Sequence, residues 1–126
     1  MFNGKKQTRL EVVIGAESVF RGELTSKGTV RVDGCFEGNI SADCVIIGES
    51  GKVIGDITGK ELIIGGKITG NSRGAESVEI QPKGEVYGDI YTVRLTVAEG
   101  AAFEGRSCTQ KNNRELEYIP AEASLG

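Results

Sequence analysis

A short motif of alternating apolar and variable residues, built around a glycine, returns six times along the chain. A representative copy is Val-Tyr-Gly-Asp-Ile at residues 86–90. The central glycines are separated by 16, 17, 15, 18 and 17 residues. They are Gly22, Gly38, Gly55, Gly70, Gly88 and Gly105. A near-constant period of this kind predicts a repeat architecture, in which each copy is one structural unit.

A second apolar element lies between the glycine motifs. It occupies residues 12–14, 30–32, 45–47, 62–64, 78–80 and 95–97. Its two outer positions are apolar in every copy, whereas its middle position varies among Val13, Arg31, Ile46, Ile63, Glu79 and Thr96. Alternation with a period of two, in mostly β-branched residues, predicts short strands whose outer pair faces a core.

The length of the period selects the fold. About 17 residues are too few for a strand–helix repeat or a propeller blade, but they fit one turn of a three-sided β-solenoid. Turns that stack at about 4.8 Å give a rod about 29 Å long for six turns. An antiparallel sandwich also explains short strands, but it does not explain why one motif returns six times. We therefore predict an all-β fold, a single-stranded parallel β-helix of about six turns.

Stacked turns place equivalent residues above one another in ladders. One predicted internal ladder is Phe20, Phe36, Val53, Ile68, Val86 and Phe103. A second is Val32, Ile47, Ile64, Ile80 and Val97. On the outside, Ile46 and Ile63 are expected to be adjacent. This apolar stripe is a candidate for lateral contact with another filament or a partner, although scattered surface hydrophobes need no such explanation.

The solenoid is expected over residues 10–108, with disordered tails at 1–9 and 109–126. Soluble solenoids cover their terminal strands with polar caps, but neither end of this sequence predicts one. We therefore expect the rods to stack end to end into filaments. The candidate contact residues are Phe103, Val12, Ile14 and Val97. The alternative is that the tails fold over the ends.

The first nine residues combine an apolar side chain with cations and contain no acid. Phe2 beside Lys5 and Lys6 suits weak attachment to an anionic membrane surface, with Met1 as the start of the tether. Many such tails on one polymer would bind well through effective concentration. A solvated, disordered start is the alternative.

Composition narrows the function classes. The 126 residues carry a net charge of −3, which argues against nucleic acid as a partner. Cys35, Cys44 and Cys108 show no CxxC spacing and are expected to be free thiols in a reducing compartment. No secretory signal or long apolar run is present, so a cytosolic location is expected.

The sequence gives little basis for catalysis. It contains no histidine, which removes imidazole acid–base chemistry, Ser-His and Cys-His nucleophiles and imidazole metal ligands. Asp56 and Asp89 recur in the glycine motifs but sit singly, beside Asn39 and Asn71, which is too little charge for a calcium ladder. We interpret these acids as solvated corners. We predict a protein that is not an enzyme and has no cofactor and no metal.

From Leu10 to about Cys108 the chain resembles the bactofilin family. The resemblance is carried by the repeat of about 17 residues, its apolar-x-Gly-Asp/Asn-Ile core and strands of the Val-Ile-Ile-Gly type. It implies a right-handed β-helix that polymerises end to end into nonpolar filaments without nucleotide. It also implies a scaffold at the inner face of the cytoplasmic membrane that positions cell-wall enzymes or other envelope proteins, or shapes the cell.

Two individual sites follow from the same resemblance. Met1 and Phe2, followed by Lys5 and Lys6, resemble the membrane-targeting start of family members. Phe103 matches the aromatic residue at their C-terminal polymerisation junction. The alternative function is a β-solenoid binding module that does not polymerise and takes a protein or carbohydrate partner. Such a module would have a discrete mass that does not depend on concentration.

Overall fold

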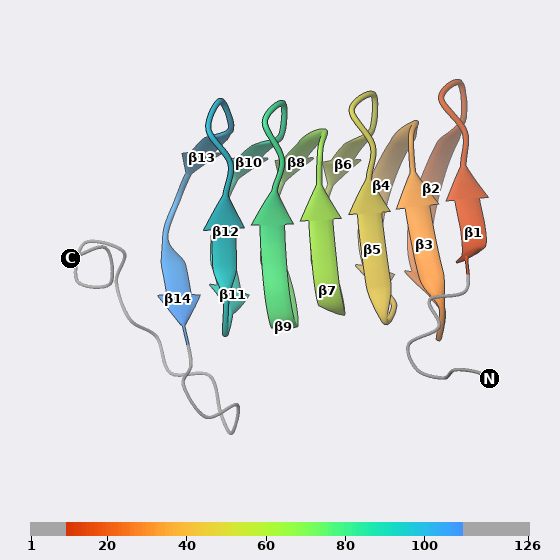
Figure 1. Cartoon of the computed structure of the whole chain (residues 1–126). Helices are drawn as coiled ribbons and strands as arrows, with labels where there is room; N and C mark the ends of the chain where they lie inside the picture. Colours follow the sequence, from red (N-terminus) through yellow and green to blue (C-terminus); the bar gives the residue numbers. More distant parts are fainter. Residues whose placement is uncertain (1–9, 110–126) are drawn as a thin grey trace.

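The computed structural model describes residues 10–109, which form fourteen β-strands and no helix (Figure 1). The strands are β1 Leu10–Ile14, β2 Val19–Thr25, β3 Thr29–Val32, β4 Cys35–Ser41, β5 Cys44–Ile47, β6 Lys52–Ile54, β7 Ile57–Ile64, β8 Lys67–Thr69, β9 Ser72–Ile80, β10 Glu85–Tyr87, β11 Ile90–Thr92, β12 Leu95–Val97, β13 Ala102–Glu104 and β14 Ser107–Thr109. The predicted tails, 1–9 and 109–126, lie outside the described residues, apart from Thr109.

All strand pairs are parallel, and they build three faces. Face A consists of β1, β3, β5, the second halves of β7 and β9, and β12. Face B consists of the first halves of β2 and β4, then β6, β8, β10 and β13. Face C consists of the second halves of β2 and β4, the first halves of β7 and β9, β11 and β14. Each face has six strands, so the predicted three-sided solenoid of six turns is confirmed.

The hand of the coil can be followed in Figure 1. The chain rises along face A at the front, turns at the top, descends behind it and returns along the bottom. Meanwhile it advances from β1 on the right to β14 on the left. That path is a right-handed coil, as the family resemblance implied.

The register of the strands confirms both predicted ladders. Phe36 pairs with Val53 and Ile68 with Val86 on face B, and the second ladder runs without a break on face A. Interior members of both ladders are almost completely buried. A third ladder fills face C and consists of Leu24, Ile40, Ile57, Ser72, Ile90 and Ser107. The core is therefore a stack of equivalent side chains along the axis of the rod.

The residues at the predicted inward positions are less buried in the two terminal turns than in the interior turns. Val97 is 45% exposed, and Val12 and Leu95 are only partly buried. Each belongs to a turn that has a neighbour on one side only. The outer positions of the apolar elements therefore face the core in every turn, but in the end turns they are not fully covered.

The repeated glycines meet at the corner between faces B and C. All six have a positive φ, between 134° at Gly22 and 149° at Gly105, a region that side chains strongly disfavour. They also stack closely. A Cβ added to Gly55 would lie 1.7 Å from the carbonyl oxygen of Gly38. The period of the sequence is thus the period of a corner that only glycine can form.

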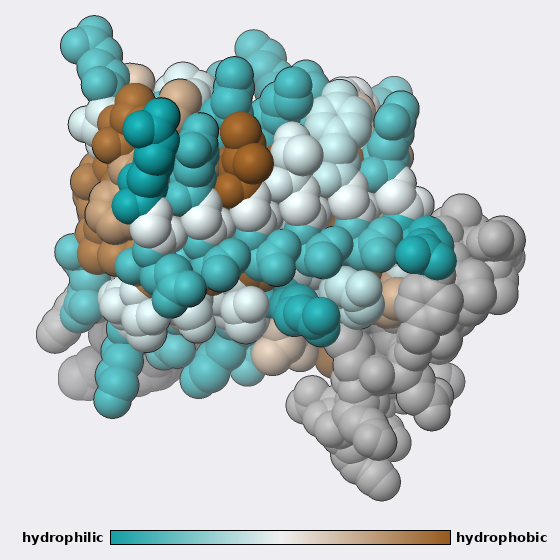
Figure 2. Space-filling view, turned by 180° about the vertical axis from the view of Figure 1, so that it is seen from behind, coloured by the Kyte–Doolittle hydropathy of each residue, from teal (hydrophilic) through white to brown (hydrophobic). Residues whose placement is uncertain are grey.

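The residue after four of the central glycines links one turn to the next through its side chain. The Oδ1 atom of Asn39 accepts a hydrogen bond from the Asp56 N–H at 3.4 Å, and Asp56 Oδ1 accepts one from the Asn71 N–H at 3.1 Å. Asn71 and Asp89 continue the series, with Asp89 Oδ1 accepting from the Arg106 N–H at 3.2 Å. Figure 2 shows a continuous row of hydrophilic side chains along the rod. Interpreting these acids as solvated corners therefore missed their main role, which is to satisfy backbone donors at the corner.

Removing the Asp89 carboxylate is expected to loosen the last turn. Asp89→Ala loses the acceptor for the Arg106 N–H and the ion pair with the Arg106 guanidinium at 3.5 Å, and should lower the free energy of unfolding by about 1–2 kcal/mol. Asp89→Asn is the matched control because it keeps Oδ1, as Asn39 and Asn71 do. Equilibrium denaturation measures both. Equal losses for the two variants would contradict the proposed role of Oδ1.

Candidate assembly interface

The N-terminal end of the rod presents an apolar surface. Its most exposed apolar side chains are Val19 at 62%, Leu10 at 55% and Val13 at 54%. Phe20 and Leu24, which begin two of the internal ladders, are only partly buried. Figure 2 shows hydrophobic surface gathered at the left end, where the first turn lies. An apolar surface concentrated at one end of a rod is typical of a protein contact.

The C-terminal end is apolar along two ladders. Phe103 closes the first ladder, pairs with Val86 in the register and is partly buried. Val97 closes the second and is 45% exposed. Leu95 packs partly against the core beside them. These side chains would be covered if another turn followed.

Within residues 10–109, each terminal strand is also hydrogen-bonded to a neighbouring strand on one side only. Strands β1 and β2 pair only with β3 and β4, and β12, β13 and β14 pair only with β9, β10 and β11. The outer edge of each terminal strand therefore presents N–H and C=O groups without a strand partner. Such edges are templates for pairing with another chain.

The four residues proposed for the junction divide between the ends. Phe103 and Val97 lie in the last turn, and Val12 and Ile14 lie in the first. Ile14 is only 7% exposed, so it contributes little surface. Leu10 and Val19, which are not among these four, contribute more. The signal that would have found them is their place at the start of a row: Leu10 begins a row whose next members, Thr29 and Cys44, are buried, and Val19 begins an outward row.

Charges at the ends of the rod are arranged in pairs. In the first two turns the Arg21 Nε atom donates to Glu37 Oε1 at 3.1 Å on the outside of face B. In the last two turns Arg106 pairs with Asp89. Both contacts are solvent-exposed, so neither adds much stability. They place cations and acids around the apolar ends rather than within them.

The predicted outward stripe lies on face A. Ile46 and Ile63 are directly paired, as the sequence indicated, and both are half-buried. They form the apolar floor of a shallow groove, whose rim includes Arg31, Asp33 and Gln81. The Arg31 Nε atom donates to Asp33 Oδ2 at 2.9 Å. The groove therefore offers an apolar centre beside a fixed ion pair.

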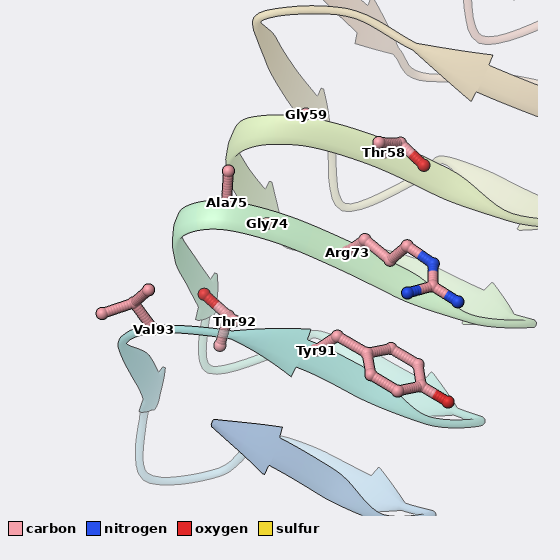
Figure 3. Close-up of a pocket in the computed structure, with 8 residues that line it drawn as sticks. All are labelled: Thr58, Gly59, Arg73, Gly74, Ala75, Tyr91, Thr92 and Val93. Carbon is pink, nitrogen blue, oxygen red and sulfur yellow. The ribbon is translucent and has the colours of Figure 1, made fainter. Parts of the chain in front are cut away.

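A second shallow groove lies on face C and is drawn in Figure 3. Thr58, Arg73 and Tyr91 lie along it on successive strands, with Val93 at its edge. The Arg73 guanidinium lies 4.3 Å from the centroid of the Tyr91 ring, so this cation is already engaged by the aromatic face. Burial raises the pKa of the Tyr91 phenol. The groove is a weaker candidate site than the ends.

The cysteines and acids suggest no chemistry in the described part of the chain. All three cysteines are free thiols: Cys35 is exposed, whereas Cys44 and Cys108 are buried. Burial raises the pKa of the Cys44 thiol, which lowers its nucleophilicity at neutral pH. Among residues 10–109 no group of three His, Cys, Asp or Glu side chains could hold a metal.

The proposed membrane tether cannot be placed. Met1, Phe2, Lys5 and Lys6 lie outside the described residues. Within residues 10–109 there is no helix with the length and apolar character needed to cross a bilayer.

Comparison with known proteins assigns the family. Residues 12–108 match the Bactofilin family, described as "Polymer-forming cytoskeletal". Bactofilin BacO of Myxococcus xanthus is 31% identical over 82% of this chain and 83% of its own length. Bactofilin BacP of the same organism is 35% identical over 87% of this chain, which spans 45% of BacP.

A solved structure has the same fold. It is a cryo-EM reconstruction of Thermus thermophilus bactofilin double helical filaments, with a TM-score of 0.68 and 22% sequence identity. The match covers 77% of this chain and 99% of that one. A cytoskeletal family agrees with the expectation that the chain is not an enzyme. From its six-turn solenoid, its family match and its similarity to BacO, we conclude that the chain belongs to the bactofilin family of polymer-forming cytoskeletal proteins.

Proposed function

We propose that this chain assembles end to end into nonpolar filaments that need no nucleotide. The observation that carries the proposal is the pair of uncovered ends, where ladder side chains and strand edges are left with a neighbour on one side only. Contact between two such ends buries apolar surface and pairs backbone groups in one step. In a nonpolar filament the N-terminal ends of two subunits contact each other, and so do the C-terminal ends of two subunits. Both junctions therefore bring two apolar surfaces together.

Assembly through these ends requires no bound nucleotide. The stretch at 55–60, Gly-Asp-Ile-Thr-Gly-Lys, superficially resembles a phosphate loop but lacks its four-residue gap and the Ser or Thr after the lysine. Residues 57–60 belong to β7 and are stacked between neighbouring turns. The free energy of assembly would come from burial of apolar surface and pairing of backbone groups at the ends. The T. thermophilus relative, solved as double helical filaments, supports filament formation by this fold.

The alternative is a binding module that does not polymerise. The groove at Thr58, Arg73 and Tyr91 favours it, because it could take a protein or carbohydrate ligand. Sedimentation over a range of concentrations separates the two functions. End-to-end assembly predicts a mass that grows with concentration, whereas one discrete mass at all concentrations would support the module.

We further propose that the filaments lie at the inner face of the cytoplasmic membrane and position envelope enzymes or other cell-shape factors. The support is the family resemblance and the composition of residues 1–9, in which Phe2 stands beside Lys5 and Lys6. One tail would bind weakly, but a filament would present many.

Deleting residues 1–9 is expected to abolish membrane binding and to leave filaments intact. Flotation with anionic vesicles is the suitable assay, because filaments sediment by themselves but do not float. The full chain should float with the vesicles, and the truncated chain should remain at the bottom of the gradient. Lys5→Glu with Lys6→Glu tests the charge alone. Equal flotation of the full and truncated chains would refute the tether.

A further inference from the structure

Cys108 is buried at a position where the solenoid by itself would leave it exposed. It belongs to the outward row of face C, which reads Thr58, Arg73, Tyr91 and Cys108 from the third turn to the last in the strand register. Ser107, the residue before it, is the inward one and closes the third ladder. Thr58 and Arg73 are exposed and Tyr91 is half-buried, whereas Cys108 is 0% exposed.

The place of Cys108 at the end of the rod makes this burial unexpected. Thr58 and Arg73 have strand neighbours on both sides and are still open to solvent. Cys108 has a strand neighbour on one side only, because β14 pairs only with β11. On face A the last turn shows the usual effect of an end, since Val97 is 45% exposed. Cys108 therefore needs a cover that the strands of residues 10–109 do not supply.

The groove on face C lies directly beside Cys108 and suits an occupant of defined chemistry. Arg73 is the one charged residue among those that line it, and the Arg73 guanidinium lies over the Tyr91 ring (Figure 3). An occupant that combines apolar side chains with an acid would complement this surface, because it would cover the ring and offer the cation a counter-ion.

We propose that the C-terminal segment of the chain, residues 110–126, docks on the outer side of face C, where it covers Cys108 and fills the groove. The segment contains the run Leu116-Glu117-Tyr118-Ile119, which supplies three apolar side chains and one acid. It also starts at the right place, because Thr109 pairs with Thr92, a residue that lines the groove. A segment tethered so closely docks at high effective concentration.

The length of the segment is sufficient for this contact. Three strand spacings, about 14 Å, separate β14 from Thr58 on β7 at the far side of the groove. The extended chain from Thr109 to Leu116 can span about 24 Å. The apolar run can therefore reach any part of the groove.

Docking on the side of the rod leaves its C-terminal end open. Val97 is exposed and Phe103 is only partly buried, so the ladders of faces A and B are not capped. The segment should therefore leave end-to-end assembly unaffected, and it should keep the groove from taking a separate ligand.

The reactivity of the Cys108 thiol tests the docking. Cys35→Ser with Cys44→Ala leaves Cys108 as the one thiol of the full chain, and Phe103→Arg keeps the C-terminal ends of two subunits apart, so that a junction cannot cover it. In this parent chain Cys108 should react slowly with an aromatic disulfide reagent. Adding Tyr118→Ala and Ile119→Ala should raise the rate about tenfold or more, because a weaker contact opens more often. Asn112→Ala with Asn113→Ala is the matched control in the same segment and should react like the parent.

Deleting residues 111–126 from the parent gives a second, independent readout. Cys108 should become reactive while the far-UV circular dichroism of the solenoid is kept. Fast reaction of Cys108 in the parent, or an unchanged rate after the deletion, would overturn the docking. Equal rates for the Tyr118/Ile119 and Asn112/Asn113 variants would contradict the assignment of the apolar run to the groove.

The same deletion in the wild-type chain separates docking on the side from a cap over the end. Docking on face C predicts filaments of unchanged length in negative-stain images. Longer filaments after the deletion would show that the segment covers the end of the rod and would contradict the proposal. The thiol assay needs no filaments, so its outcome is independent of the proposed end-to-end assembly.

Discussion

Replacing Phe103 by arginine is expected to stop filament growth while leaving the β-solenoid folded. Phe103 is the last member of the face B ladder and contacts the core on one side only. At a junction its other side would be covered by a second chain. An arginine there would bury an unpaired charge, which costs several kcal/mol. Because the side chain is only partly buried within the subunit, far-UV circular dichroism should not change.

The product of Phe103→Arg also reports the polarity of the filament. In a nonpolar filament only the C-terminal junction is broken, so a discrete dimer joined through the N-terminal ends should remain. A head-to-tail filament would fall to monomers. Val93→Arg is the matched control, because Val93 is an apolar residue at the corner just before the last turn, 38% exposed, but outside the ladders. The junction assignment would fail if Phe103→Arg sedimented like the wild type.

Adding a single methyl group at Gly55 is expected to destabilise the solenoid more than any surface change. Gly55 has a φ of 142°, and an added Cβ would lie 1.7 Å from the Gly38 carbonyl oxygen. Backbone strain and overpacking each cost about 1–3 kcal/mol. Gly55→Ala should therefore lower the free energy of unfolding by about 3–5 kcal/mol, measured by chemical denaturation.

Substitutions at two other glycines separate the contribution of backbone strain from that of overpacking. Gly22 has nearly the same φ, 134°, but a Cβ there would meet only the Phe20 ring at 3.7 Å. Gly22→Ala should therefore show strain alone, about 1–2 kcal/mol. Gly15 lacks the positive φ and has its nearest neighbour at 3.8 Å, so Gly15→Ala should be nearly neutral. Equal losses at Gly55 and Gly22 would show that close stacking of the turns is not the cause.

The interior of the solenoid could be predicted because the repeat overdetermines it. Six copies of one motif fix the stacking, and a slip of one residue would turn every inward side chain outward. The pairing of Phe36 with Val53 and of Ile46 with Ile63 follows directly from this constraint. Alternation also separated the inward residues from the variable ones.

The corner and the ends could not be predicted in the same way. The hydrogen bond from the Asp56 N–H to Asn39 Oδ1, and those that continue the series, depend on how a glycine with positive φ orients the next side chain. The hydropathy pattern of the sequence does not encode that geometry. Exposure at the ends depends on which side of a residue lacks a neighbour. For this reason the sequence selected Ile14, which is largely covered, and passed over Val19, which is not.

The most direct test of end-to-end assembly is a cryo-EM reconstruction of the assembled full-length protein. End-to-end stacking predicts continuous filaments with strands spaced about 4.8 Å apart along the axis. It also predicts about 29 Å of rise for each six-turn subunit, with Phe103 at a junction between two like ends. Discrete particles whose size does not depend on concentration, or filaments in which Phe103 faces solvent, would contradict it.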